Sequence, residues 1–244
     1  MYRPFAFVLA AASIAACADS GDEGLQIVKN VAPDTGCSFT SEATEPFLAR
    51  GVANIVAPYY EIHPQILSRI SAVEGEESLR TVFTTGARVD IEFPDETLFT
   101  QAEQDMLRDQ AKTRFESLFS VPIAPNGGIT DGSFVGIPES LMEAIRAKVP
   151  AARPGSPTSF TTTVITKSVV FGTLGDGEVT SQQFTFPVTI CNNCLINIIG
   201  SCPLPMGSMV TNTGNACNPY QDQPVDCCTT TQGEVRCPAI IAQM

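Results

Sequence analysis

The sequence predicts a mainly β fold: an antiparallel β-sandwich with one or two short helices and a disulfide-braced C-terminal cap. Three observations support this prediction. Gly and Pro each occur 18 times and Trp is absent, a composition that suits strands and turns better than helices. Several segments alternate apolar and polar residues or are rich in Thr, Val and Ile. Seven of the nine cysteines fall within residues 191–237.

The N-terminal part of the chain contains several strand-like segments. Leu25 to Val28 predicts a first strand, and Pro33 to Gly36 predicts the turn that follows it. Residues 47–56 form a second, mostly apolar run that predicts a strand. Residues 59–70 are compatible with either a strand or a short helix, because Pro64 interrupts them.

The clearest strand signal lies within residues 87–93. Charged residues alternate there with the apolar residues Ala87, Val89, Ile91 and Phe93. This period of two predicts a strand with one buried and one solvent-facing side.

A hairpin is expected in the second half of the chain. Residues 159–171 and 178–190 are rich in Thr, Val and Ile, and Asp176-Gly177 lies between them as a turn sequence. Phe134 to Ile137 predicts a further short strand.

Two helices are predicted. Thr100 and Glu103 have the spacing of a capping box, and apolar residues then recur at helical spacing, so we expect a helix over residues 101–118. Its later part is equally compatible with a strand that runs to Ile123. Residues 138–148 predict a second helix, with Pro and Glu in its first turn and basic residues in its last.

Residues 1–16 have the pattern of an export signal. Arg3 supplies a positive charge, and the small and apolar residues 4–16 form a run too short to cross a bilayer. Ile14-Ala15-Ala16 stands directly before Cys17 and resembles the processing site of bacterial lipoproteins. The resemblance implies that residues 1–16 are removed and that Cys17 carries acyl chains, palmitate among them, which anchor the protein in a membrane.

The resemblance also predicts a location. In lipoprotein sorting, an aspartate directly after the acylated cysteine signals retention in the inner membrane. Ala18 occupies that position and favours the outer membrane, on its periplasmic or its surface face, although Asp19 follows. Residues 17–24 would then be the lipidated cysteine and an acidic tether that reaches at most about 25 Å when extended. We therefore expect a lipid-anchored protein of the cell envelope.

The chain is acidic. Its formal net charge is −12, and removal of Arg3 with the signal would leave −13. Such a surface repels phosphate backbones and anionic lipid headgroups, so nucleic acid is not an expected partner. We expect the charge to maintain solubility and the acyl chains to hold the membrane.

Eight cysteines other than Cys17 are disulfide candidates. They are Cys37, Cys191, Cys194, Cys202, Cys217, Cys227, Cys228 and Cys237. An even number in an exported protein predicts up to four disulfides. Because seven of them lie in the tail, full oxidation requires one bond to leave the tail, so we predict that Cys37 pairs with a tail cysteine. The adjacent Cys227 and Cys228 are not expected to pair with each other, because a vicinal bond is strained.

Cys191-x-x-Cys194 allows two other interpretations. The spacing suits a zinc ligand pair, but there is no second such pair and no histidine nearby. A catalytic C-x-x-C motif begins a helix, whereas this one follows a strand-like run. We therefore predict a structural disulfide, with no metal and no cofactor.

No motif predicts a catalytic residue. His63 is the only histidine, and because no nucleophile motif accompanies it, a packed or surface role is expected. The acidic run Glu74 to Glu77 cannot be told from solvated charge, so it identifies no glycosidase pair. Asp176 to Glu178 lacks the spacing of a calcium loop and is explained by a hairpin turn.

The run Phe186 to Leu195, together with the Cys- and Pro-rich tail, resembles uncharacterised lipoproteins of Gram-negative bacteria. The resemblance supports an envelope topology and implies no activity. We interpret residues 25–190 as a sandwich domain, immunoglobulin-like in general style, and residues 191–244 as the cap. The expected function is a non-enzymatic binding or structural module of the envelope, whose partner is an envelope protein or polysaccharide. The alternatives are an accessory subunit of an envelope complex, a hydrolase of envelope polymers, and a thiol–disulfide oxidoreductase that uses the C-x-x-C.

Overall fold

The computed structural model describes residues 24–33, 36–39, 47–94 and 97–238. The predicted signal, the lipidation site Cys17 and all of the tether except Gly24 lie outside the described residues, as does part of the predicted turn Pro33 to Gly36. Within the described residues the fold is mainly β, with 44% of them in strands, and it includes two α-helices.

The largest sheet has the strand order β3-β13-β11-β6-β7, and two short strands extend it, since β12 pairs with β11 and β8 pairs with β6. Its strands are β3 (Gly51–Asn54), β6 (Val82–Glu92), β7 (Arg114–Leu118), β8 (Pro122–Ile123), β11 (Thr161–Leu174), β12 (Gly177–Thr180) and β13 (Phe184–Cys191). The predicted hairpin is present, and its turn falls between the paired residues Leu174 and Gly177. Its second arm, expected as one strand over residues 178–190, is divided into β12 and β13, which both pair with β11.

Two smaller sheets share the hydrophobic core of the large sheet. One has the order β2-β1-β5-β9, and the other pairs β10 with β4. Their strands are β1 (Leu25–Val31), β2 (Phe47–Leu48), β4 (Tyr60–Ile62), β5 (Pro64–Ser68), β9 (Ile129–Asp131) and β10 (Phe134–Ile137). The ambiguous segment 59–70 is thus two strands, and Pro64 begins the second of them. The predicted run 47–56 is divided between two sheets, because β2 pairs with β1 and β3 pairs with β13.

One hydrophobic core joins these layers. The alternation in β6 is as predicted: Ala87, Val89 and Ile91 are buried, while Arg88 and Glu92 are exposed. Core side chains from the smaller sheets and from the second helix complete the cluster. Among them are Leu25, Ile62, Ile66, Phe134, Ile137, Leu141 and Ile145.

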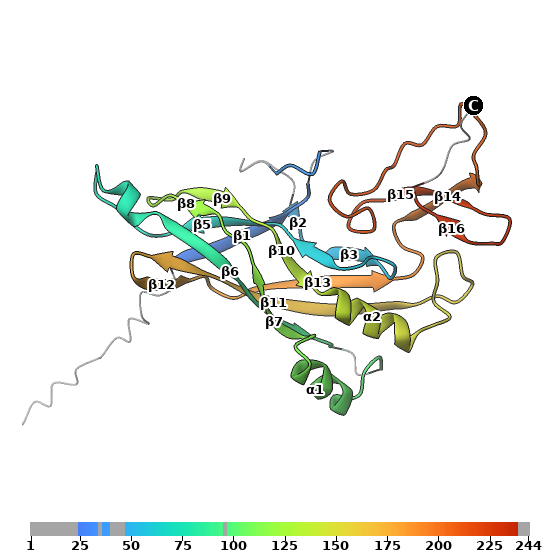
Figure 1. The fold of residues 1–244 in the computed structure, drawn as a ribbon, viewed down its shortest axis with the longest axis horizontal. Helices are drawn as coiled ribbons and strands as arrows, with labels where there is room; N and C mark the ends of the chain where they lie inside the picture. The colour runs from blue at the N-terminus through green and yellow to red at the C-terminus, as the bar shows by residue number, and fades with distance from the viewer. Residues whose placement is uncertain (1–23, 34–35, 40–46, 95–96, 239–244) are drawn as a thin grey trace, which may run out of the picture.

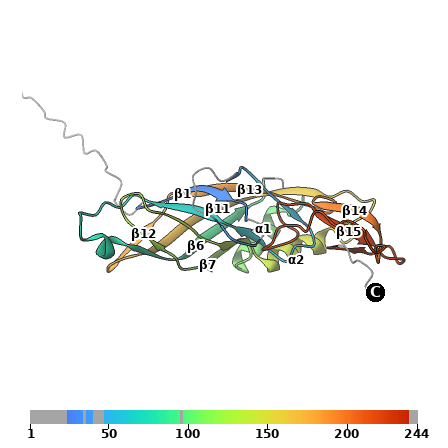
Figure 2. The ribbon, with the colours of Figure 1, turned by 90° about the horizontal axis from the view of Figure 1, so that it is seen from above.

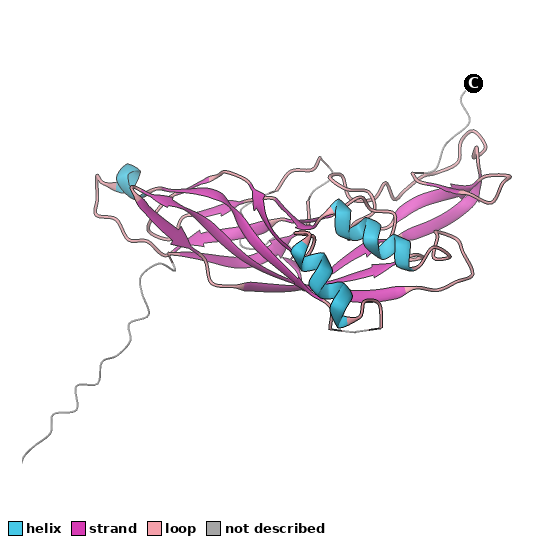
Figure 3. Ribbon diagram, turned by 60° about the horizontal axis from the view of Figure 1, so that its bottom comes forward, coloured by secondary structure: helices cyan, strands magenta, loops and turns pink. Residues whose placement is uncertain are grey.

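The two helices lie next to each other in the middle of the molecule (Figure 3). The helix α2 (Glu139–Lys148) is close to the predicted 138–148, and Lys148 at its end forms an ion pair with Glu103 of α1 (Gln101–Asp109). The capping box of α1 is present, because Glu103 accepts a hydrogen bond from the Thr100 backbone at 3.0 Å.

The prediction of one helix over residues 101–118 is wrong beyond Asp109. Ala111 has a φ of 55°, and the N–H groups of Ala111 and Lys112 donate to the carbonyls of Arg108 and Leu107. This left-handed termination closes the last turn of the helix. The chain then enters β7, where exposed residues alternate with partly buried ones.

Three strands of the tail form a separate sheet, with the order β14-β15-β16. Its strands are β14 (Ile196–Ser201), β15 (Val225–Thr229) and β16 (Val235–Arg236). The pairs β13–β3 and β14–β15 are parallel, so the expectation of a purely antiparallel architecture is wrong at these two places. Both pairs join segments that are distant in sequence or linked by a long loop, which permits a parallel arrangement.

The molecule is elongated (Figures 1 and 2). The start of β1, the strand β12 and the 3₁₀-helix η1 (Glu77–Arg80) lie toward one end, and β14, β15 and β16 lie at the other. We call these the β1-start end and the tail end.

Candidate functional site at the junction of body and tail

All eight cysteines other than Cys17 form disulfides. The bonds are Cys37–Cys217, Cys191–Cys194, Cys202–Cys228 and Cys227–Cys237. Cys37 is bonded to a tail cysteine across a separation of 180 residues, which agrees with the expectation from the odd number of tail cysteines. The adjacent cysteines take different partners.

The C-x-x-C disulfide is built into a structural joint. Cys191 is the last residue of β13, and β14 follows, so the motif does not begin a helix. Asn54 of β3 donates from its side-chain amide to the carbonyls of Asn192, at 3.0 Å, and Cys194, at 2.8 Å. These bonds fix the loop between the two cysteines. A surface pocket of about 460 Å³ lies beside it and includes Arg50 in its lining.

A short segment of the tail closes the outer edge of the large sheet. Backbone hydrogen bonds run from Asn54 N–H to Tyr220 O, at 2.9 Å, and from Asp222 N–H to Val52 O, at 2.8 Å. The segment therefore acts as an additional edge strand on β3. Gln221 also bridges to β4, because its side chain accepts from Glu61 N–H at 2.9 Å and donates to Glu61 O at 2.7 Å. The tail is in this way part of the fold of the body.

A half-buried carboxylate lies at the centre of this junction. Asp222 Oδ1 accepts from Val52 N–H at 2.8 Å, and Oδ2 accepts from the Tyr60 hydroxyl at 2.9 Å. Burial raises the pKa of Asp222 from 3.8 to about 6, and burial together with the nearby carboxylate raises the pKa of Tyr60 well above 10.0. Gly51 makes room for the pair, since a Cβ there would lie 2.2 Å from the Tyr60 hydroxyl oxygen.

His63 lies in the same region and is buried, as a packed histidine is expected to be. Its ring stacks on Phe39, with 4.3 Å between the ring centroids. Neither ring nitrogen has a hydrogen-bond partner among the described residues, and the nearest carboxylate oxygen, on Glu61, is 3.8 Å from Nε2. Burial lowers the pKa of His63 from 6.5 to about 4, so the ring is neutral at neutral pH and is not poised to transfer protons there.

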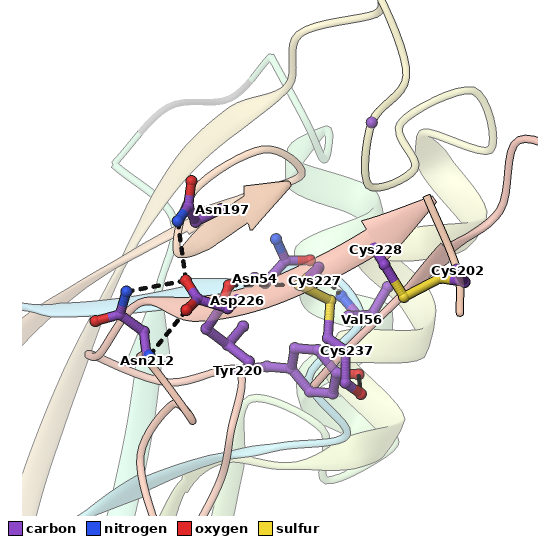
Figure 4. The surroundings of a disulfide bond; sticks show 12 residues. Asn54, Val56, Asn197, Cys202, Asn212, Tyr220, Asp226, Cys227, Cys228 and Cys237 are labelled. Atoms are coloured by element: carbon purple, nitrogen blue, oxygen red, sulfur yellow. Dashed lines mark hydrogen bonds between the residues drawn. A yellow bond between two sulfur atoms is a disulfide. The ribbon is translucent and has the colours of Figure 1, made fainter. Parts of the chain in front are cut away.

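A second carboxylate organises the tail sheet (Figure 4). Asp226 of β15 accepts hydrogen bonds from the side-chain amides of Asn197 and Asn212, each at 2.9 Å, and from the backbone N–H groups of Thr211, at 2.8 Å, and Asn212, at 3.0 Å. These donors lower the pKa of Asp226 far below its usual value. The carboxylate binds the loop between β14 and β15 to the strand beside the disulfides of Cys227 and Cys228.

Asp222 and Asp226 were not identified from the sequence. Acidic residues are mostly solvated in folded proteins, and nothing in the local pattern marks these two as buried. The high content of Asn and Thr in the tail is a signal that could have indicated Asp226, because such side chains supply the donors that a buried carboxylate requires. No such signal marks Asp222, whose donors are Val52 and Tyr60.

A pocket of about 570 Å³ lies on the outer face of the large sheet. Its carboxylates are ion-paired: Glu116 contacts Arg88 at 3.3 Å, and Asp90 contacts Arg108 at 3.1 Å. A glycosidase needs a carboxyl group held protonated near neutral pH beside a second, free carboxylate. The paired arrangement in this pocket does not provide that chemistry.

Within the described part of the chain, no group of three or more His, Cys, Asp or Glu side chains is arranged to hold a metal ion. In the same residues, neither helix is long and apolar enough to span a bilayer. A scan against protein-family models finds no match for the sequence, and a search of curated proteins finds none either.

Proposed function

We propose that this chain is a lipid-anchored protein of the bacterial cell envelope, held by acyl chains on Cys17, whose folded body is a non-enzymatic binding or structural module. The arrangement of the two ends carries the proposal. The described chain begins at Gly24, at the β1-start end, whereas the disulfide-braced tail sheet lies at the opposite end (Figure 1). An anchor a few residues before Gly24 would place the tail end farthest from the membrane, where it can meet a partner.

The four disulfides support an oxidising location outside the cytoplasm. Three of them brace the tail itself or its joint with β13, and Cys37–Cys217 ties the tail to the N-terminal part of the chain. The finer fold assignment belongs to the same proposal: the shared core between the large sheet and the smaller sheets supports a β-sandwich, immunoglobulin-like in general style.

The test is the intact mass of the membrane-extracted protein, alkylated without reductant. The expected mass corresponds to a chain that begins at an acylated Cys17 and carries no alkylated thiol. An unmodified N-terminus would contradict the anchor. Two alkylated thiols at Cys191 and Cys194 would contradict the structural role of that disulfide and favour the oxidoreductase alternative.

One observation favours a second candidate, an accessory subunit of an envelope complex. The tail end exposes three large apolar side chains, Ile198, Met206 and Met209, and exposed apolar surface of this kind is typical of protein interfaces. A photo-cross-linking amino acid at Met209 is expected to give a discrete protein adduct in intact cells. The same group at Thr173, which is exposed near the β1-start end, is the matched control and is expected to give no such adduct. Equal adducts at both positions would contradict a specific interface at the tail end.

A further inference from the structure

The β1-start end carries the point at which the described chain enters the fold. Gly24 O accepts a hydrogen bond from Arg69 N–H at 2.8 Å. A Cβ on Gly24 would lie 2.7 Å from Val179 and 3.0 Å from Ile70, so the backbone is held closely against the ends of β5 and β12. Gly24, where the described chain begins, is therefore fixed at this end.

The distance between this end and a lipid anchor is short. Seven residues, 18–24, separate Cys17 from the body, and even a fully extended segment of that length spans only about 25 Å. An acyl anchor at Cys17 would hold the β1-start end next to the headgroups at all times.

The same end exposes large apolar side chains. Val73 and Leu79 lie in the connection between β5 and β6, and Phe83 is the second residue of β6; their exposed fractions are 64%, 74% and 54%. Leu118, at the end of β7, is also exposed and lines a surface pocket of about 420 Å³ together with Phe83. We call Val73, Leu79, Phe83 and Leu118 the apolar tip.

Charge at this end limits the kind of lipid that it fits. Glu74, Glu76 and Glu77 are exposed within the same connection and outnumber its two exposed arginines, Arg69 and Arg80, so the connection carries a net negative charge. Anionic headgroups would repel these carboxylates, whereas zwitterionic headgroups would not. The apolar side chains and the acidic residues together suit shallow contact with an uncharged membrane surface.

We propose that the apolar tip rests in the headgroup region of the bilayer that holds the anchor, so that the body stands with its tail end away from the membrane. This inference depends on the lipid anchor of the proposed function. It adds a second contact with the membrane, made by side chains of the folded body, and it commits to a zwitterionic lipid surface as the partner of the tip.

The absence of Trp from the chain allows a direct test. Leu79→Trp and Met209→Trp place a single Trp at the tip or at the tail end, and the native side chains are similarly exposed, at 74% and 79%. The full lipidated chain is reconstituted in phosphatidylcholine vesicles with and without brominated phosphatidylcholine. Brominated lipid is expected to quench Leu79→Trp severalfold more strongly than Met209→Trp, and only Leu79→Trp should shift its emission to shorter wavelength. Equal quenching, or quenching of neither variant, would overturn the inference.

Two further readouts separate this inference from the anchor itself. Flotation of the vesicles reports the anchor, so a wild-type chain that does not float with them contradicts the proposed function. Flotation without quenching of Leu79→Trp overturns only the contact of the tip with the membrane. Addition of phosphatidylglycerol at low salt is expected to reduce the quenching, and increased quenching would overturn the choice of zwitterionic lipid. A third outcome is that acrylamide fails to quench the Trp of Leu79→Trp in native membranes while brominated lipid also leaves it unquenched. This outcome would assign the tip to a protein partner and overturn the proposal.

Discussion

Replacement of Asp222 by asparagine is expected to change how the stability of the protein depends on pH. In the folded protein, burial raises the pKa of this carboxyl from 3.8 to about 6. The folded state therefore binds the proton more tightly than the unfolded chain does. The stability that this tighter proton binding contributes is fully present below the pKa of the unfolded chain and is lost as the pH rises through the pKa of the folded protein. A shift of this size corresponds to about 3 kcal/mol of lost stability at neutral pH.

Asp222→Asn removes this titration and keeps the size and shape of the side chain. We expect the free energy of unfolding of the variant, relative to wild type, to increase by about 3 kcal/mol between about pH 3 and about pH 7. Part of the gain at neutral pH is offset, because the hydrogen bonds from Val52 and Tyr60 are weaker to an amide than to a carboxylate. The amide does not titrate, so its own hydrogen bonds contribute the same amount at every pH. The quantity to measure is therefore how the difference in unfolding free energy between variant and wild type changes with pH.

The assay is urea unfolding of the disulfide-intact protein, followed by circular dichroism across this pH range. Asp176→Asn, in the exposed hairpin turn between β11 and β12, is the matched control, and its stability relative to wild type is expected not to vary with pH. A constant difference between Asp222→Asn and wild type would refute the reasoning, because it would mean that Asp222 ionises in the folded protein as it does in the unfolded chain.

Three other predictions follow from the junction and the tail. Burial lowers the pKa of His63 from 6.5 to about 4, so the stability that the neutral ring contributes is present above the unfolded pKa and is lost as the pH falls toward the folded one. His63→Phe should therefore remove an acid destabilisation of about 3 kcal/mol. Urea unfolding that is equally acid-sensitive in both proteins would contradict this. Asp226→Ala leaves several neutral donors without an acceptor and should lower the free energy of unfolding by about 1–3 kcal/mol. A loss no larger than that of an exposed Asp→Ala change would show that the cluster contributes little. The double variant Cys37→Ser, Cys217→Ser releases a loop of 180 residues, and on the chain-entropy model its free energy of unfolding should fall by up to about 5 kcal/mol. Thermal unfolding measures the loss. An unchanged midpoint would show that the loop is already constrained without the bond.

The elements with a strong local signal were predicted well from the sequence. The alternation in β6 and the hairpin of β11 and β12 required only the side-chain period and a turn sequence. The helix α2 has acidic and basic residues at the appropriate ends. In each case the local pattern and the tertiary environment favour the same structure.

The wrong predictions concern segments whose secondary structure or strand pairing is determined by tertiary contacts. The helix α1 ends with Ala111 in a left-handed conformation, a position that glycine usually occupies, and so the sequence lacked the ordinary stop signal. Phe115 fits a helical face by spacing, but it also fits the alternation of β7, and pairing with β6 determines the outcome. The parallel pairing of β13 with β3 depends on contacts between distant segments, which no local pattern reports.

The candidate site was predictable only in its covalent part. The count of cysteines led to the bond between Cys37 and the tail, because parity does not depend on three-dimensional structure. The surroundings of Asp222 and Asp226 depend on donors from separate strands and loops, and the identity of an aspartate does not reveal whether such donors will meet it.

The edge strand that the tail supplies has a consequence for the order of events during biosynthesis. Residues 220–222 cover β3 by hydrogen bonds to Val52 and Asn54, yet they are made nearly 170 residues later. Until they emerge, the large sheet ends in an uncovered strand, which is a site for misplaced pairing between chains. If the chain is exported as proposed, it has to be kept from folding or associating until residues 220–222 have been synthesised and translocated. The N-terminal part of the fold is therefore completed by a segment that is made much later.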